Sequence, residues 1–318
     1  MDLSLRYIST KLDLELQGNP DKKISGLADI SQANHNSITY VYKLDKNDLG
    51  LYKDCGAILT CYENKGHFQG HNLILSKNPR LSFAKLTKFF KSERKMIQNS
   101  KFEINPLFKN LKIGSDFLFG SNVVIEDDVT IGNNVTFGHN VVIHNGTTIG
   151  DNVIIDSGAI IGSEGFGNIR ENDEWIHIKH LGGVTIGNNV SIGSNCCVDR
   201  GTLKNTVIHD GVIIDNLVHI AHNVTIGENT AIAAKVGIAG SCNIGKRNMI
   251  GGMVGIVDHI NIADDVIISA TSTVNKDIKE PGTYTGIMPI SNHANWKRIA
   301  LWITKLDKIA KVLKLKKI

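Results

Sequence analysis

A histidine, an aspartate and a glycine in the second half of the chain have the types and spacing of a catalytic site for acyl transfer. His222 lies in the segment IAHNVTIG, Asp215 is seven residues before it, and Gly240 is eighteen residues after it. A neutral imidazole can accept the proton of an attacking amine or hydroxyl group, and a carboxylate can fix its tautomer. A backbone N–H can stabilise the oxyanion of a tetrahedral intermediate. We therefore predict His222 as the general base, Asp215 as its orienting residue and Gly240 as the oxyanion donor.

A second histidine extends this predicted site. His259 follows His222 by 37 residues, and we predict that His259 and Asn216 bind substrate. The sequence contains neither a G-x-S-x-G motif nor a paired Cys–His motif, so we expect direct transfer without an acyl-enzyme. Each residue also has a purely structural alternative, because surface histidines, corner aspartates and turn glycines are common.

A repeat of six residues must position these groups. An apolar residue recurs at every sixth position in runs of nine, three and twelve hexads, which start at Ile113, Ile186 and Ile208. This period fits no helix and indicates a parallel β-helix in which each hexad is one side of a coil. Three sides make a coil of about 18 residues, so we predict about eight coils with residues eighteen apart stacked on one another. Gly and Asn suit the left-handed backbone of the corners.

The hexads are interrupted twice. The first interruption is a loop from about Glu164 to Gly183, which contains Trp175, His177 and His180. The second adds four residues between the second and third runs of hexads. Ligand contacts are often placed on excursions from a rigid scaffold.

The flanking segments lack the hexad. We predict an N-terminal α/β domain at 1–105, the β-helix at 106–278, and a turn segment followed by a basic amphipathic helix at 279–318. Apolar residues spaced three and four apart predict one stripe on this helix: Trp296, Ile299, Ile303, Leu306, Ala310 and Leu313.

Composition excludes several classes of protein. The chain has 318 residues, 42% of them hydrophobic and 21% charged, which is ordinary for a globular protein. A formal charge of +4 is too weak to predict nucleic-acid binding. No apolar stretch is long enough to span a bilayer, although proximity to a membrane surface stays open. The start lacks a secretory signal, and five cysteines without a Cys-x-x-Cys pair favour a reducing compartment, so we predict a cytoplasmic protein.

The histidines also allow a metal-site alternative. His139 and His144 are five residues apart, as in metal-binding β-helices of the γ-carbonic anhydrase type. A third ligand at suitable spacing is missing. We therefore predict no metal and no cofactor.

Long segments of the chain resemble one bacterial enzyme family. The hexads, IGSEGFGN, VDRGTLKNTVIHDGVIIDN, IAHNVTIGENTAIAAKVGIAGS and EPGTYTGIMP are similar to UDP-3-O-(3-hydroxyacyl)glucosamine N-acyltransferases of lipid A biosynthesis. The similarity covers most of residues 105–300 and continues more weakly in GAILTCY and KNPRLSFAKL. Both interruptions of the hexads fall where this family has them.

The resemblance implies a homotrimer of left-handed β-helices with active sites between subunits. It implies transfer of an (R)-3-hydroxyacyl chain from acyl carrier protein, the co-substrate, to the 2-amine of a UDP-3-O-acylglucosamine. The family's general base maps onto His222 and a second functional histidine onto His259, while Gly240 and Asp215 fall at the oxyanion and orienting positions.

One segment departs from the family pattern. Members carry an F-x-x-N-P-K-Y-like segment that contacts uracil, and the corresponding stretch here is TYVYKLDKND. Tyr40 can replace the aromatic residue, so we predict that it binds substrate. Lys43 and Lys46 stand where Asn and Tyr are expected, which implies a divergent paralogue or other residues that read the base.

Two features concern the acyl donor. Ala270, Thr271, Ser272 and Thr273 offer only small side chains where the family implies an acyl groove, so we expect long chains. The stretch from Lys297 to Lys317 contains eight of the 35 basic and one of the 31 acidic residues, so it carries +7 and the rest of the chain −3. We predict that Arg298, Lys305 and Lys308 bind the acidic carrier protein.

Two other functions stay open at this point. A UDP-N-acetylglucosamine O-acyltransferase shares the hexads and a catalytic histidine, but lacks an N-terminal domain of this length. A trimeric scaffold or binding protein could keep the hexads without catalysis.

Overall fold

The computed structural model describes residues 2–90, 110–286 and 290–313, and the chain divides into two compact units, Met1–Arg94 and Lys95–Ile318. The first unit is an α/β domain. Its five-stranded sheet has the order β2 (Glu15–Gln17), β7 (Leu73–Leu75), β6 (Ala57–Thr60), β5 (Ser37–Val41) and β4 (Gly26–Leu27). A two-stranded ribbon, short 3-10 turns and two helices complete it: β1 (Leu3–Ser4), β3 (Lys23–Ile24), η1 (Ile30–Gln32), η2 (Lys46–Asp54), η3 (Tyr62–His67), α1 (Leu5–Leu12) and α2 (Pro79–Thr87).

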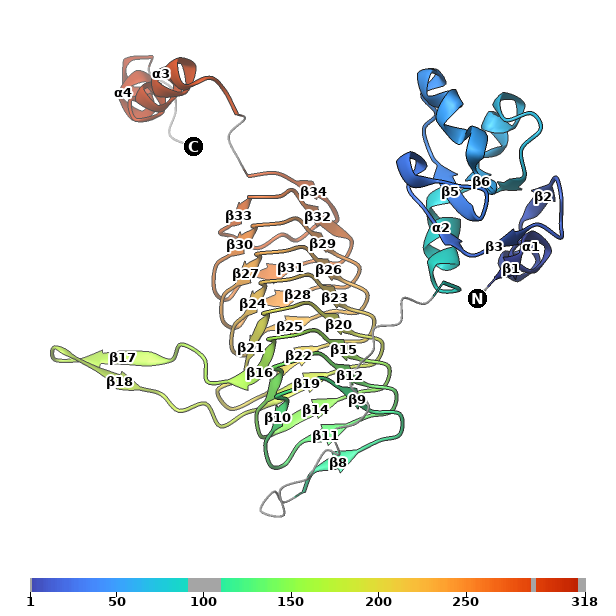
Figure 1. Cartoon of the computed structure of the whole chain (residues 1–318). Helices are drawn as coiled ribbons and strands as arrows, with labels where there is room; N and C mark the ends of the chain where they lie inside the picture. The colour runs from blue at the N-terminus through green and yellow to red at the C-terminus, as the bar shows by residue number, and fades with distance from the viewer. Residues whose placement is uncertain (1, 91–109, 287–289, 314–318) are drawn as a thin grey trace. The chain divides into compact units, whose positions relative to one another are not determined.

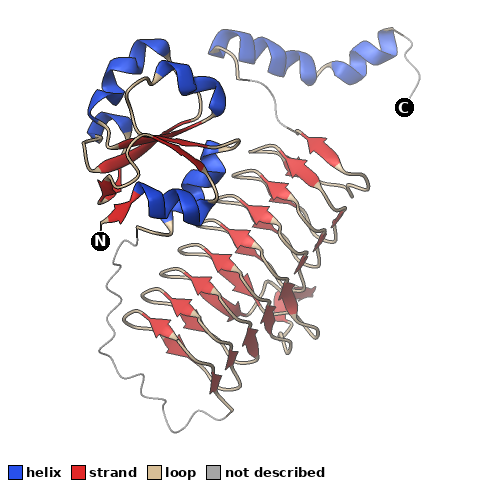
Figure 2. Ribbon diagram, turned by 90° about the vertical axis from the view of Figure 1, so that its right-hand side faces the viewer, coloured by secondary structure: helices blue, strands red, loops and turns tan. Residues whose placement is uncertain are grey.

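The second unit is dominated by the predicted parallel β-helix, whose short strands form three flat faces (Figures 1 and 2). The first face has eight strands: β10 (Val124–Ile125), β13 (Val142–Ile143), β16 (Ile160–Ser163), β21 (Cys197–Asp199), β24 (His219–Ile220), β27 (Gly237–Ile238), β30 (Gly255–Ile256) and β33 (Thr273–Val274).

The second and third faces continue the same turns. The second face has eight strands: β8 (Lys112–Ile113), β11 (Thr130–Ile131), β14 (Thr147–Ile149), β19 (Val184–Ile186), β22 (Thr206–Ile208), β25 (Thr225–Ile226), β28 (Asn243–Ile244) and β31 (Asn261–Ile262). The third has nine: β9 (Leu118–Phe119), β12 (Thr136–Phe137), β15 (Ile154–Ile155), β20 (Ser191–Ile192), β23 (Ile213–Ile214), β26 (Ala231–Ile232), β29 (Met249–Ile250), β32 (Val266–Ile268) and β34 (Gly282–Tyr284).

The hexad residues build the core, as predicted. Isoleucines such as Ile143, Ile220 and Ile238 are fully buried inside the helix and pack on the same position of the next turn. Polar residues at the corners adopt positive φ, and asparagines on neighbouring turns are hydrogen-bonded, as between Asn134 Nδ2 and Asn152 Oδ1 at 2.9 Å. Asparagine tolerates this conformation better than most residues do, which explains its recurrence at the corners.

The two interruptions leave the stack intact. Ordinary partners are eighteen residues apart, as Thr136 and Ile154 are. Across the first interruption Ile154 pairs with Ser191, 37 residues on, and across the second Ser191 pairs with Ile213, 22 residues on. The first interruption contains a hairpin of β17 (Asn168–Glu171) and β18 (Glu174–His177), which projects from the helix in Figure 1.

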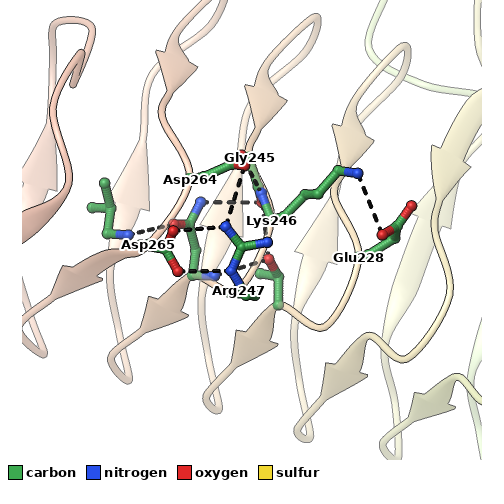
Figure 3. Close-up of polar contacts among 9 residues, drawn as sticks. Glu228, Gly245, Lys246, Arg247, Asp264 and Asp265 are labelled. Atoms are coloured by element: carbon green, nitrogen blue, oxygen red, sulfur yellow. Dashed lines mark hydrogen bonds and ion pairs between the residues drawn. The ribbon is translucent and has the colours of Figure 1, made fainter.

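Charged corner residues connect turns near the C-terminal end of the helix (Figure 3). Arg247 forms ion pairs with Asp265 at 2.7 Å and Asp264 at 3.5 Å, and Lys246 pairs with Glu228 at 3.3 Å. The hydrogen bond from Arg247 lowers the pKa of the Asp265 carboxyl. These pairs join residues about eighteen apart, so they reinforce the stacking of turns.

The C-terminal segment forms two helices where the sequence predicted one. α3 (His293–Ile303) ends at Thr304 and α4 (Leu306–Val312) begins after Lys305. Lys305 N–H bonds to the carbonyl of Trp302, three residues back, so the chain tightens and turns at this point. Most of the predicted apolar stripe is exposed. Within the described ranges, no helix has the length and apolarity needed to cross a membrane.

Candidate active site

His222 lies just after β24, at the corner between the first and second faces. Its carbonyl accepts a hydrogen bond from Ser241 N–H at 2.9 Å, which aligns it with the same corner of the next turn. A Cβ atom on Gly240 would lie 2.6 Å from both Cε1 and Nε2 of His222. The structure thus places Gly240 directly against the imidazole, as the eighteen-residue spacing predicts, and only glycine fits there.

Asn223 determines which nitrogen of His222 carries the proton. Asn223 Oδ1 accepts hydrogen bonds from the backbone N–H and the hydroxyl of Thr202, at 3.0 and 2.9 Å. Because a backbone N–H can only donate, this atom is the amide oxygen. His222 Nδ1 lies 3.1 Å from the same oxygen and must therefore donate. The other ring nitrogen, Nε2, is left with a free lone pair beside Gly240.

The structure does not bring Asp215 to His222 within one chain. Asp215 is exposed, and its Oδ1 accepts hydrogen bonds from the backbone and side-chain N–H groups of Asn216, at 2.7 and 2.9 Å. Asn216 Oδ1 in turn accepts from Ser194 N–H at 2.7 Å. Seven residues are one side plus one position, so Asp215 and Asn216 occupy the preceding corner, and the predicted contact is corrected to Asn223.

A groove of about 710 Å³ on the first face contains His222 and Gly240. Its lining is mostly apolar and extends over successive turns to Thr273. His259, the predicted substrate-binding residue, also lines this groove. The backbone N–H of His259 donates to the carbonyl of Gly240 at 3.0 Å. The His259 side chain is 74% exposed, so its imidazole is accessible to a ligand. His222, Gly240 and His259 therefore lie on three successive turns of one groove.

The first interruption of the hexads covers one side of His222. His180 is 2% exposed, and its ring centroid lies 5.1 Å from that of His222 in an edge-to-face arrangement. Neither ring nitrogen of His180 has a hydrogen-bond partner among the described residues. Burial and the proximity of His222 lower the pKa of His180. A Cβ on Gly165 would lie 2.9 Å from His222 Cβ, so the loop packs tightly on His222.

A carboxylate–imidazole pair lies in the same groove. Asp199 is 5% exposed, and its Oδ1 accepts a hydrogen bond from the Ser163 hydroxyl at 2.9 Å. Its Oδ2 lies 3.5 Å from His219 Nε2. Burial raises the pKa of the Asp199 carboxyl despite these partners. With Cys197, these side chains form a set whose potential ligand atoms lie within 4.8 Å of one another, which a metal ion could use.

The histidines of the metal-site alternative are not gathered. His139 Nδ1 accepts a hydrogen bond from Ser121 N–H at 2.8 Å. His144 Nδ1 lies 3.0 Å from Glu126 Oε1. Both therefore serve contacts between adjacent turns.

Tyr40 lies in the N-terminal unit, beside a shallow pocket of about 320 Å³. Its ring stacks on Phe83 at a centroid distance of 4.3 Å and remains 39% exposed. Asp29 lines the same pocket. Lys43 is exposed, and the side chain of Lys46 lies outside the part of the chain that the structure describes.

The predicted carrier-protein residues are on the C-terminal helices. Arg298, Lys305 and Lys308 are all exposed, and the Arg298 guanidinium contacts Asn295. Lys311 is paired with Asp307 at 2.7 Å. The last basic residues of the chain, Lys314, Lys316 and Lys317, lie outside the described residues.

The sequence pattern indicates no role for Asn223, Asp199 or His219, and it places His180 only within the first interruption. Asn223 follows His222 directly, so its adjacency was a usable signal. Asp199 and His219 are separated by the second interruption, which replaces the eighteen-residue spacing by 22. His180 comes from the first interruption, where no period predicts position.

Comparison with known proteins agrees with the hexad repeat and the parallel β-helix. The family model described as "Bacterial transferase hexapeptide (six repeats)" matches residues 110–145 and 205–240. A UDP-N-acetylglucosamine acyltransferase from Campylobacter jejuni has a similar structure, with a TM-score of 0.51 and 26% identity over 56% of this chain and 69% of that one.

Sequence relatives are more similar still. A UDP-3-O-acylglucosamine N-acyltransferase from Acidovorax sp. (strain JS42) is 51% identical over 153 residues, which are 48% of this chain and 47% of that protein. The protein of the same name from Saccharophagus degradans is 55% identical over 153 residues, covering 48% and 45%. The chain thus spans about half the length of the curated relatives it matches. These matches confirm the predicted resemblance: over about half of its length, this chain is similar to UDP-3-O-acylglucosamine N-acyltransferases and carries the bacterial transferase hexapeptide repeat.

Proposed function

We propose that this protein is a cytoplasmic N-acyltransferase of lipid A biosynthesis. It would transfer an (R)-3-hydroxyacyl chain from acyl carrier protein to the 2-amine of UDP-3-O-(3-hydroxyacyl)glucosamine. The observation that carries this proposal is the free Nε2 of His222, held against Gly240 in an apolar groove. The names of the relatives support the choice of acceptor.

The proposed reaction needs one proton carrier. The amine nitrogen attacks the thioester carbonyl carbon while His222 Nε2 takes the amine proton. Gly240 N–H donates to no acceptor among the described residues, so it is available to the oxyanion of the tetrahedral intermediate. The carbonyl reforms, the C–S bond breaks, and His222 returns the proton to the departing thiolate. The products are an amide and the carrier-protein thiol, and no cofactor enters this balance.

The two substrates would use different parts of the chain. We assign the uridine of the acceptor to the N-terminal pocket beside Tyr40, whose exposed ring can stack on a base. The acyl chain would lie along the groove toward Thr273, the one member of the predicted small-residue segment that lines it. We expect donors longer than about fourteen carbons to be preferred. Competition between carrier-protein thioesters of different length tests this, and preference for shorter chains would contradict it.

Acyl carrier protein would dock through charge. Arg298, Lys305 and Lys308 are exposed cations that can attract an acidic partner. Reversing the charge of Lys305 and Lys308 should raise the KM for the acyl-carrier substrate and leave the KM for the UDP-sugar nearly unchanged. An equal change in both would contradict the assignment.

A homotrimer is the proposed assembly. Apolar side chains on the third face are exposed, among them Ile213, Met249 and Ile267, and they line a groove of about 540 Å³. Exposed apolar patches on a rigid face often mark contacts between chains. Asp215 lines the same groove. We therefore propose that its carboxylate contacts a neighbouring copy of the chain.

The decisive experiment is an assay with hydroxyacyl carrier protein and the UDP-3-O-acyl sugar. Wild type should form the amide, and His222→Ala should lower kcat by about 10²- to 10⁴-fold, since general acid–base catalysis contributes that much. UDP-N-acetylglucosamine as acceptor tests the O-acyltransferase alternative, because only that enzyme would form an ester. If wild type turns over neither of the two acceptors, the scaffold alternative is favoured.

A further inference from the structure

His219 is a polar group of the groove that the proposed reaction does not use. It lies on β24, three residues before His222, and its side chain is 53% exposed. It lines the same groove as His222 and Gly240. A ligand whose reacting atom lies at His222 would therefore pass close to His219.

Asp199 lies beside this imidazole on the preceding turn. Its Oδ1 is held by the Ser163 hydroxyl, and Oδ2 faces His219 Nε2 at 3.5 Å. A carboxylate at this position favours the tautomer with the proton on Nε2. Nδ1 then carries a lone pair, and no partner of Nδ1 is found among the described residues. The groove therefore presents a hydrogen-bond acceptor suited to a hydroxyl group.

The groove opens immediately beyond His219. On the first face His219 pairs with Gly237, and Gly237 with Gly255. Neither glycine has a positive φ, and a Cβ on either would meet no atom within 4 Å in the described structure. Neither backbone strain nor crowding requires glycine at these two positions. Each of the two glycines nevertheless leaves bare backbone that an acyl chain can approach closely.

We propose that His219, anchored by Asp199, determines specificity for the hydroxyl on the third carbon of the donor chain. This inference rests on the proposed function. The hydroxyl is two carbons from the reacting carbonyl, so it would lie beside His219 while the rest of the chain passes over Gly237 and Gly255. A donor without the hydroxyl would desolvate the acceptor on His219 without replacing its hydrogen bond, and sites built around such a bond discriminate strongly.

The test compares 3-hydroxyacyl and unsubstituted acyl donors of equal length on acyl carrier protein. Wild type should prefer the hydroxylated donor by about 10- to 100-fold in kcat/KM, the value expected for one unmet buried hydrogen bond. His219→Ala should reduce this ratio about tenfold or more, mainly by loss on the hydroxylated donor. His219→Gln, which keeps an acceptor, should restore part of the ratio. His209→Ala is the matched control, because His209 lies on another face, outside the groove.

The outcomes distinguish failure of the inference about His219 from failure of the proposed function. An active wild type that does not discriminate, or a His219→Ala variant that loses both donors equally, overturns the inference and leaves the proposed function standing. A wild type inactive with both donors overturns the proposed function as well. One zinc per chain that is lost in Cys197→Ser would assign Asp199 and His219 to a metal and overturn the inference. Thermal melts of His219→Ala should match wild type, because the side chain is half exposed.

Discussion

The dipeptide His-Asn occurs at three corners of the β-helix, and the imidazoles at two of them, His139 and His222, have different contacts. Asn140 and Asn223 both have left-handed backbone, with φ of 57° and 62°. At the first corner His139 Nδ1 accepts Ser121 N–H from the turn below. At the second corner His222 Nδ1 donates to Asn223.

The next turn also differs between the two corners. Above His139 stands Ser157, whose hydroxyl accepts the backbone N–H of His139 at 3.0 Å. Above His222 stands Gly240, which has no side chain and leaves Nε2 in an open groove. Two copies of one motif therefore differ in the partner of Nδ1 and in the residue eighteen positions later.

The largest expected effect separates the two histidines directly. His222→Ala should lower kcat by about 10²- to 10⁴-fold, whereas His139→Ala should leave kcat unchanged. Steady-state kinetics at saturating substrates make the comparison. Comparable losses in both variants would show that the corners differ less than their contacts indicate.

Substitution of the stacked residue comes next. Gly240→Ala places a methyl group 2.6 Å from Nε2 of His222, so it should displace the imidazole and disturb the proposed oxyanion donor. We expect kcat to fall about 10²- to 10³-fold, as for loss of one oxyanion donor. Ser157→Ala is the matched change at the other corner and should not affect turnover. A Gly240→Ala variant with normal kcat would remove Gly240 from the mechanism.

A smaller loss of kcat is expected when Asn223 is substituted, and none when Asn140 is substituted. Asn223→Gly keeps the left-handed backbone and removes the amide that contacts His222, together with the hydrogen bonds of that amide to Thr202. Loss of one hydrogen bond predicts a fall in kcat of about tenfold. Asn140→Gly should leave kcat unchanged in the same assay. Equal activity of both variants would mean that the His222 tautomer is fixed by another group.

The smallest effect is on stability and depends on pH. The pKa of His180 is lowered in the folded protein, so the unfolded chain binds its proton more readily. This contribution to stability is therefore complete above about pH 6.5, the unfolded value, and is lost as the pH falls through the folded pKa. His180→Gln cannot be protonated and should flatten the decline of melting temperature between neutral and mildly acidic pH. An unchanged decline would assign it to other groups.

Much of the fold and part of the site could be predicted because the hexad converts sequence distance into spatial distance. The eighteen-residue spacing places Gly240 on His222, and twice that spacing plus one residue places His259 in the same groove. Asp215 was assigned wrongly within the chain because seven residues reach the neighbouring corner, where its carboxylate binds Asn216.

The remaining contacts depend on the interruptions. Cys197 and His219 pair across 22 residues, so a count of eighteen misses the Asp199–His219 pair. His180 reaches His222 from a loop whose path follows no period. The break between α3 and α4 depends on a local tightening at Lys305 that continued apolar spacing does not reveal.

The interruptions also make this protein a candidate scaffold for peptide display. One corner already accommodates 19 residues beyond the usual spacing and another accommodates four, yet the strands on either side keep their pairing. A foreign loop grafted in place of the tip of the β17–β18 hairpin should therefore be carried on a rigid, regularly spaced support. In a multichain assembly, such grafts would be presented as a defined array.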